Sequence, residues 1–105
     1  MDAIPREILI CQTDDGREPF SEWLDALSSK VRGIVRNRVD RLEDGNLGDT
    51  RSVGKGVCEL RINFGPGYRV YFGQVRQEVH LIGGGAKDTQ EADIAAAIKF
   101  WSTHA

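Results

Sequence analysis

The 105-residue chain lacks any long apolar run. Its longest uninterrupted apolar stretch, residues 94–98, is far shorter than the roughly 18 residues that a membrane-spanning helix needs. No apolar segment follows a basic start, so we expect neither a secretory signal peptide nor a membrane partner. The chain is therefore expected to stay in the cytoplasm.

Cysteine and histidine are scarce, with two of each. Cys11 and Cys58 lie in apolar, strand-like segments and lack the spacing of a metal site, so we expect buried thiols in a reducing compartment. Two cysteines could form one disulfide, but nothing in the sequence favours it. The histidines, His80 and His104, are too scattered to suggest ligands. We therefore expect no metal and no other cofactor.

Repeats, linkers and low-complexity segments are also missing, and the length suits one domain spanning residues 1–105. The net charge of −2 would ordinarily argue against a nucleic-acid partner. However, residues 51–87 carry six Lys/Arg against two Asp/Glu, an excess of four positive charges. A local basic surface can still attract phosphate, because salt screens charges more than about 10 Å away.

Hydrophobic spacing predicts three helices. After a β-rich segment at 6–13 and a turn at 14–16, Pro19 suits the first position of a helix. Apolar residues then recur at helical spacing from 20 to 42, and a break at Ser28-Ser29 or Gly33 would make a helical hairpin. A last apolar stripe, 94–101, follows a capping-box-like pair, Asp88 and Glu91.

Between these helices the hydrophobic period changes to two. Apolar and polar residues alternate from 58 to 64, again from 68 to 73 after the 65–67 turn, and a third strand is predicted at 78–82. Such alternation indicates a sheet with one face on the helices and the other towards water. We expect this meander to bury Cys58, Leu60, Ile62, Val70 and Phe72 against Trp23, Leu27, Val35 and Trp101. The expected order is β-α-α-β-β-β-α, an α+β fold.

The same alternation places four side chains suited to phosphate chemistry on the water-facing side of adjacent strands: Glu59, Arg61, Arg69 and Tyr71. Lys87 follows the triple glycine 83–85 and could reach the same face. Guanidinium groups bind phosphate bidentately and neutralise charge that develops during phosphoryl transfer. On the pattern alone, alternating Arg and Glu are more typical of a solvated sheet face with cross-strand ion pairs. Further basic candidates for RNA contacts are Arg51, Lys55, Arg76 and His80.

Five stretches together resemble the RelE/HigB toxin superfamily, in its branch of phage-derived addiction-module killer proteins. They are FSEWLDAL (20–27), RLEDGNLGD (41–49), VGKGVCELRI (53–62), GPGYRVYF (65–72) and GGAKDTQ (84–90). They run in the family's order, from the first predicted helix into the last. The Glu-Leu-Arg, Gly-Tyr-Arg-Val-Tyr and Gly-Gly-x-Lys-x-x-Gln elements are specific only in combination.

The resemblance implies a RelE-like fold, in which a helical hairpin and a C-terminal helix flank a curved antiparallel sheet. It also implies a type II toxin that cuts translated mRNA at the ribosome without metal, the RNA's own 2′-hydroxyl attacking the adjacent phosphate. Arg61, Arg69 and Lys87 match basic positions of the family. Arginine cannot lose its proton near neutral pH, so the candidates for the base are Glu59, His80 and Lys87.

The implied partners are mRNA, the ribosome and a cognate helix-turn-helix antitoxin, through which alone operator DNA would be bound. Two alternatives stay open, because this superfamily hosts more than one activity. One is a ParE-like toxin that inhibits DNA gyrase without cutting nucleic acid. The other is an inactive module that only binds an antitoxin.

Overall fold

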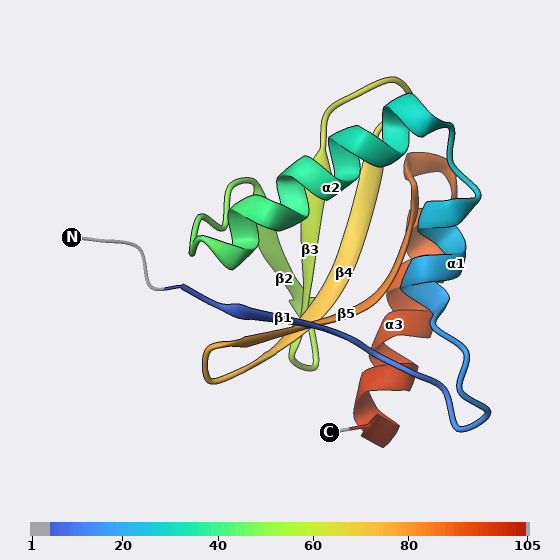
Figure 1. Ribbon diagram of the computed structural model, residues 1–105. Coiled ribbons are helices and arrows are strands. Elements are labelled where there is room, and N and C mark those ends of the chain that lie inside the picture. The colour runs from blue at the N-terminus through green and yellow to red at the C-terminus, as the bar shows by residue number, and fades with distance from the viewer. Residues whose placement is uncertain (1–4, 105) are drawn as a thin grey trace.

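The computed structural model describes residues 5–104 and confirms an α+β fold (Figure 1). Five strands and three helices follow one another along these residues. In chain order they are β1 (Glu7–Ile10), α1 (Pro19–Asp25), α2 (Ser29–Glu43), β2 (Thr50–Gly54), β3 (Val57–Ile62), β4 (Tyr68–Val75), β5 (Glu78–Ala86), the 3₁₀ turn η1 (Lys87–Thr89) and α3 (Gln90–His104).

The sheet is mixed, with strand order β1-β5-β4-β3-β2. Strands β2 to β5 form an antiparallel meander, whereas β1 pairs parallel to β5 at one edge. The expectation of a wholly antiparallel sheet is therefore wrong at β1. The chain between β1 and β5 is long enough for the crossover that a parallel pair requires.

Strand β2 was not expected, because the first strand of the meander was predicted at 58–64; β2 and β3 form a hairpin. Its turn residues Lys55 and Gly56 both have positive φ, 55° and 83°. Two positive values are typical of the tight type I′ turn, in which Asn or Asp usually takes the place of Lys55. The order is consequently β-α-α-β-β-β-β-α, with one more strand than expected.

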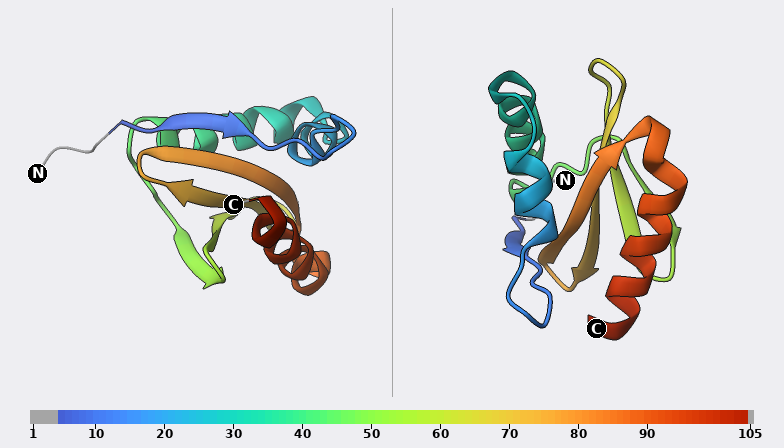
Figure 2. Two further views of the ribbon diagram at one scale, coloured as in Figure 1. Left: turned by 90° about the horizontal axis from the view of Figure 1, so that it is seen from below. Right: turned by 90° about the vertical axis from the view of Figure 1, so that its right-hand side faces the viewer.

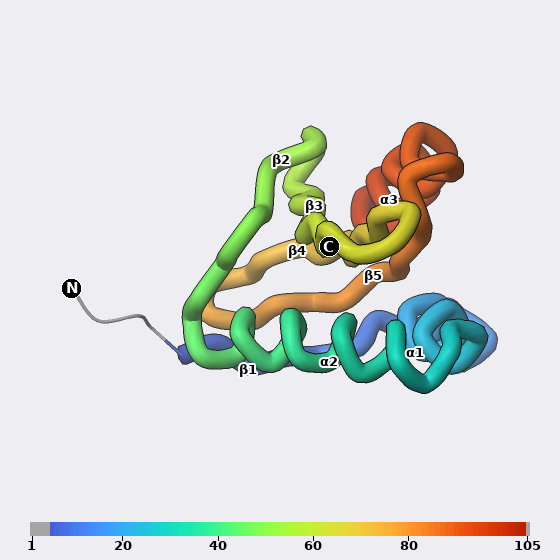
Figure 3. The backbone as a smooth tube through the Cα atoms, turned by 90° about the horizontal axis from the view of Figure 1, so that it is seen from above, coloured from blue at the N-terminus to red at the C-terminus, as the bar shows by residue number. Residues whose placement is uncertain are grey.

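Helices cover both faces of the curved sheet. The pair α1 and α2 lies on one face and α3 lies against the other (Figures 2 and 3). Pro19 begins α1, and Ser28 separates the two helices because its hydroxyl accepts a hydrogen bond from the Val31 amide, 3.3 Å away. Gly33 lies inside α2 and does not interrupt it.

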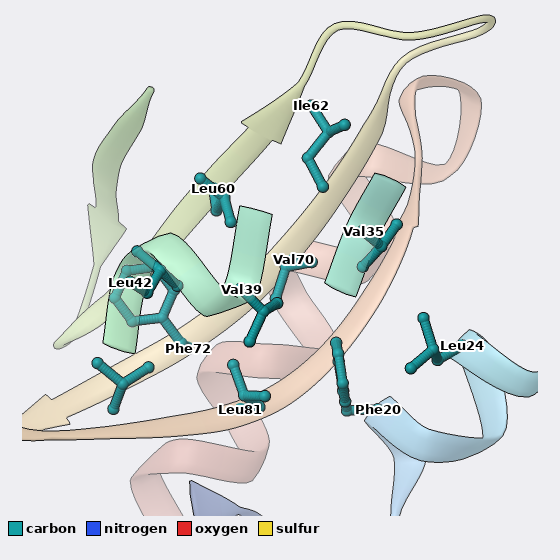
Figure 4. Packing of buried hydrophobic residues seen from close by; sticks show 11 residues of the cluster. Phe20, Leu24, Val35, Val39, Leu42, Leu60, Ile62, Val70, Phe72 and Leu81 are labelled. Atoms are coloured by element: carbon teal, nitrogen blue, oxygen red, sulfur yellow. The ribbon is translucent and has the colours of Figure 1, made fainter. Parts of the chain in front are cut away.

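The main core lies between the sheet and the pair α1/α2 (Figure 4). The alternation in β3 and β4 predicted this face correctly. Partly buried residues, including Trp23, Leu27 and Cys58, pack against its rim. Its buried residues are Phe20, Leu24, Val35, Val39, Leu42, Leu60, Ile62, Val70, Phe72, Val79 and Leu81.

A second, smaller apolar cluster lies under α3, on the face that was expected to meet water. Trp101 belongs to this cluster, so its expected place against the main core is wrong. Trp101 packs on this face because Gly73 has no side chain there. A Cβ on Gly73 would overlap the Trp101 ring. The buried members are Cys11, Val57, Tyr71, Ile82, Ala97 and Trp101. Within residues 5–104, helices long and apolar enough to traverse a bilayer are absent.

Candidate functional site

A polar hollow of about 410 Å³ lies where β3 turns into β4 and β5 runs into η1. Three of its lining side chains are cations, and none of the described residues that line it is acidic. The hollow is lined by Arg61, Asn63, Phe64, Gly65, Pro66, Gly67, Arg69 and Lys87.

Pairing of β3 with β4 brings two of the cations together. Arg61 and Arg69 are directly opposite each other across the two strands. Lys87 joins them because its backbone amide donates a 3.0 Å hydrogen bond to the carbonyl of Gly67 in the β3–β4 turn. Like charges directly opposite each other destabilise a sheet. An anion in the hollow would relieve that repulsion.

Arg61 is the accessible member of the pair. Its side chain is 42% exposed, and its Nε lies 3.7 Å from Oδ2 of Asp49. The Asp49 side chain is itself half exposed, and an ion pair of this kind between exposed groups contributes little to stability. The Arg61 guanidinium can therefore exchange this partner for a ligand at low cost.

Arg69, in contrast, is buried, so the expectation that it faces water is wrong, and it is held from two sides. Its Nε lies 4.0 Å from Oε2 of Glu59. The turn makes room for it, since a Cβ on Gly67 would come within 3.2 Å of Nη1, and Gly67 has a φ of +85° that favours glycine. Arg69 Nε is itself buried and makes no hydrogen bond within the described part of the chain.

Glu59 is fully buried, so the expectation that it faces water is wrong. Arg51 Nε and Gln90 Nε2 each donate a 3.0 Å hydrogen bond to its carboxylate, and Gln90 belongs to α3, which covers it. Burial by itself raises the pKa of Glu59, but these hydrogen bonds outweigh burial and hold the pKa below its usual range. Glu59 is therefore an ionised counter-ion behind the hollow and does not line it.

Tyr71 is also buried, and it faces a second hollow. That hollow has a volume of about 270 Å³, is mainly apolar, and lies between α3 and the Gly83–Gly84 part of β5. Burial raises the pKa of Tyr71, and the negative charge of Glu59 raises it further. Tyr71 therefore stays a neutral phenol and does not line the cationic hollow, and the expectation of a water-facing side chain is wrong.

Three of the basic RNA candidates lie towards the opposite end of the sheet. His80 pairs with Gly73, which is four residues along β4 from Arg69, or about 13 Å. Its Nε2 lies 3.0 Å from Oε1 of Glu78. Lys55 and Arg76 occupy the β2–β3 and β4–β5 turns. Arg51 is the exception, because it reaches Glu59.

Two residues of the site were not singled out by sequence reasoning. Phe64 continues the apolar phase of β3, but it lies beyond the strand and is 36% exposed. Gln90 lies in the GGAKDTQ stretch, yet nothing in that stretch indicates that its amide reaches Glu59. Groups of three or more His, Cys, Asp or Glu side chains that could hold a metal ion are absent from residues 5–104.

Comparison with known proteins gives one clear relationship. No protein-family model matches the chain. An uncharacterized protein of Haemophilus influenzae (strain ATCC 51907 / DSM 11121 / KW20 / Rd) is 44% identical over 80 residues, which cover 74% of this chain and 81% of that protein. With this identity and coverage, the chain belongs to the same family as the Haemophilus influenzae protein.

Proposed function

We propose that this chain is the toxin of a type II toxin–antitoxin system, of the RelE/HigB type, and that it cleaves mRNA on the ribosome. The proposal rests on one observation above all. Arg61, Arg69 and Lys87 line a single hollow that no described acidic residue lines. The five stretches that resemble the family contain these three residues and the turn that joins them.

The chemistry and the placement of the cations suit a phosphodiester. A guanidinium offers a planar fork of donors that matches two phosphate oxygens. Arg69 is already oriented by Glu59 and by the turn, so little ordering is needed when the phosphate binds. Donors fixed in this way stabilise charge that develops in a transition state.

In the proposed reaction the RNA supplies its own nucleophile. The 2′-hydroxyl oxygen bonds to the adjacent phosphorus and releases its proton to a solvent water molecule, while the bond from phosphorus to the 5′-oxygen breaks and that oxygen takes a proton from the Lys87 ammonium. The products are a 2′,3′-cyclic phosphate and a 5′-hydroxyl. Arg61 and Arg69 hold the phosphate oxygens. Lys87, which lines the hollow and is exposed, is assigned to protonate the leaving oxygen.

A second candidate function is a toxin-like module that does not cut RNA. The observation in its favour is that two of the candidates for the general base do not line the hollow. Glu59 is buried behind it, and His80 lies about 13 Å away along the sheet. Such a module would act on another target, as a gyrase inhibitor of the same superfamily would, or would only bind its antitoxin.

The proposed partners follow from toxicity. A toxin that arrests its own host needs a neutraliser, and we assign that role to a helix-turn-helix antitoxin that covers the cationic hollow and alone contacts operator DNA. Co-purification with the product of the neighbouring gene checks this directly. Failure to form a complex even at low salt would contradict it.

The deciding experiment is inducible expression followed by primer extension on a translated message. We expect growth arrest and new 5′ ends within the coding region, and we expect both to disappear with Arg61→Ala. Cleavage in vitro should persist in the presence of a chelator. Arrest without new 5′ ends would favour the second candidate, and the absence of arrest would favour a module that only binds an antitoxin.

A further inference from the structure

An exposed aromatic ring stands on the wall of the cationic hollow. Phe64 is 36% exposed and lines the hollow together with Arg61, Arg69 and Lys87. Single exposed apolar residues are common on protein surfaces. The other two large exposed apolar side chains of the described residues, Ile10 and Val75, are aliphatic and do not line this hollow. Phe64 thus combines aromatic character with a place beside the phosphate-binding cations.

The backbone of Phe64 is fixed on both sides of the turn. Its amide donates a 3.0 Å hydrogen bond to the carbonyl of Ile62, and its own carbonyl accepts a 2.9 Å hydrogen bond from Gly67. The same turn leads into β4, which holds Arg69, and its Gly67 carbonyl accepts the hydrogen bond from the Lys87 amide. The backbone segments that present the ring and the cations are therefore joined by hydrogen bonds at this turn, so one ligand could contact both.

The ring is also positioned by α2. Lys30 Nζ lies 5.4 Å from the centroid of the Phe64 ring, a distance at which a cation is attracted to the face of an aromatic ring. An ammonium can occupy only one face of a ring. Phe64 also lines the hollow and is partly exposed, so part of this side chain lies beside the cations.

In a nucleic acid a base is attached to the phosphate through a single sugar, so a phosphate in this hollow brings a base close to its walls. We propose that Phe64 is a stacking platform for an unpaired base adjacent to the phosphate that Arg61 and Arg69 hold. The ligand class is then single-stranded RNA, because the bases of a duplex are already stacked and paired. This inference rests on the proposed function and names the form of its substrate.

The experiment compares three probes by equilibrium titration: a short single-stranded RNA, the same RNA annealed to its complement, and inorganic tripolyphosphate. Wild-type chain should bind the single strand more tightly than the other two. Phe64→Ala should weaken binding of the single strand by about 5- to 100-fold, which corresponds to the loss of one base–aromatic stack. Binding of tripolyphosphate should change by less than about twofold.

Matched variants separate stacking from packing. Phe64→Leu should stay weak, whereas Phe64→Trp should restore binding and show quenching of the added tryptophan by RNA. Val75→Ala, at an exposed apolar position that does not line the hollow, is the control and should bind as the wild type does. The Tm of Phe64→Ala should stay near that of the wild type, because the ring is already partly exposed.

Several results would overturn the stacking role. They are equal affinity of the wild type for RNA and tripolyphosphate, equal behaviour of Phe64→Ala and Val75→Ala, or loss of both ligands together in Phe64→Ala. The proposed function fails separately, if the wild type binds RNA through Phe64 but cuts no translated message. Cleavage that is normal in Phe64→Ala would instead contradict only the stacking role.

Discussion

The two faces of the sheet differ in what they bury. Under α1 and α2 the core is entirely apolar, with Leu60, Val70 and Phe72 at its centre. Under α3 the apolar cluster is smaller, and Glu59 and Arg69 are buried beside it. The same period-two alternation produces both faces. One face supplies the hydrophobic stabilisation, and the other holds charged groups in the orientation that the hollow needs.

Burying a charge costs free energy, so other interactions on the second face, the one under α3, must offset that cost. Removing an ion from water costs several kcal/mol unless partners replace the water. Glu59 has such partners in Arg51 and Gln90, with Arg69 next to them. We therefore expect the first face to dominate the free energy of unfolding and the second face to dominate activity.

The largest expected effect on stability is at the first face. Leu60→Ala should lower the free energy of unfolding by about 2–5 kcal/mol, because it removes buried methyl groups and leaves a cavity. Leu60 is 1% exposed and belongs to the main core. Urea unfolding measures this change. RNA cleavage by the fraction of the variant that remains folded should stay near normal. A large loss of cleavage by the folded variant would contradict the division of stability and activity between the two faces.

On the second face, Glu59→Gln should cost about 1–3 kcal/mol at pH 7, since it weakens a charged hydrogen bond within a buried network. The folded-state pKa of Glu59 lies below its usual range, so its ionised form stabilises the protein above the unfolded pKa of about 4.3. That contribution is lost as the pH falls through the folded-state pKa.

The stability difference between the wild type and Glu59→Gln should therefore shrink on acidification. Urea unfolding at a series of pH values measures it, and Glu91→Gln, which removes an exposed carboxylate of α3, is the control. A difference that is independent of pH would show that Glu59 is not an ionised counter-ion.

Two glycines should respond to substitution by alanine with opposite signs. Gly73→Ala should destabilise the protein by about 1–3 kcal/mol, because the new methyl group overlaps the Trp101 ring on the second face. Gly33→Ala, inside α2 with open space around it, should stabilise the protein by about 0.5–1 kcal/mol. Thermal unfolding of both variants distinguishes them. Equal responses would contradict the placement of Trp101.

The first face could be predicted from the sequence because alternation alone decides which strand residues share a side. The second face could not. A helical stripe such as that of α3 does not show which side of a sheet it will cover, and the bare backbone at Gly73 and Gly85 is visible only once α3 is in place. Side chains there would meet Trp101 and Asp93.

The candidate site was likewise predictable only in part. Alternation predicts that Arg61 and Arg69 are neighbours, and the strand register pairs them directly. Lys87 also lies in the same hollow, as its loop suggested. Burial of Glu59 and the exposure of Phe64 depend on where α3 packs and where β3 ends, which hydrophobic spacing leaves open.

The most direct test is the single-turnover rate at which Arg69→Ala cleaves a ribosome-bound message. Our account predicts a fall of about 10²- to 10³-fold, the usual effect of removing one preorganised donor, with ribosome affinity little changed. Arg69→Lys should restore only part of the rate, because a point charge does not reproduce the planar fork. Arg36→Ala, an exposed arginine of α2 outside the hollow, should leave the rate unchanged. An Arg69→Ala variant that cleaves as fast as the wild type would contradict the account.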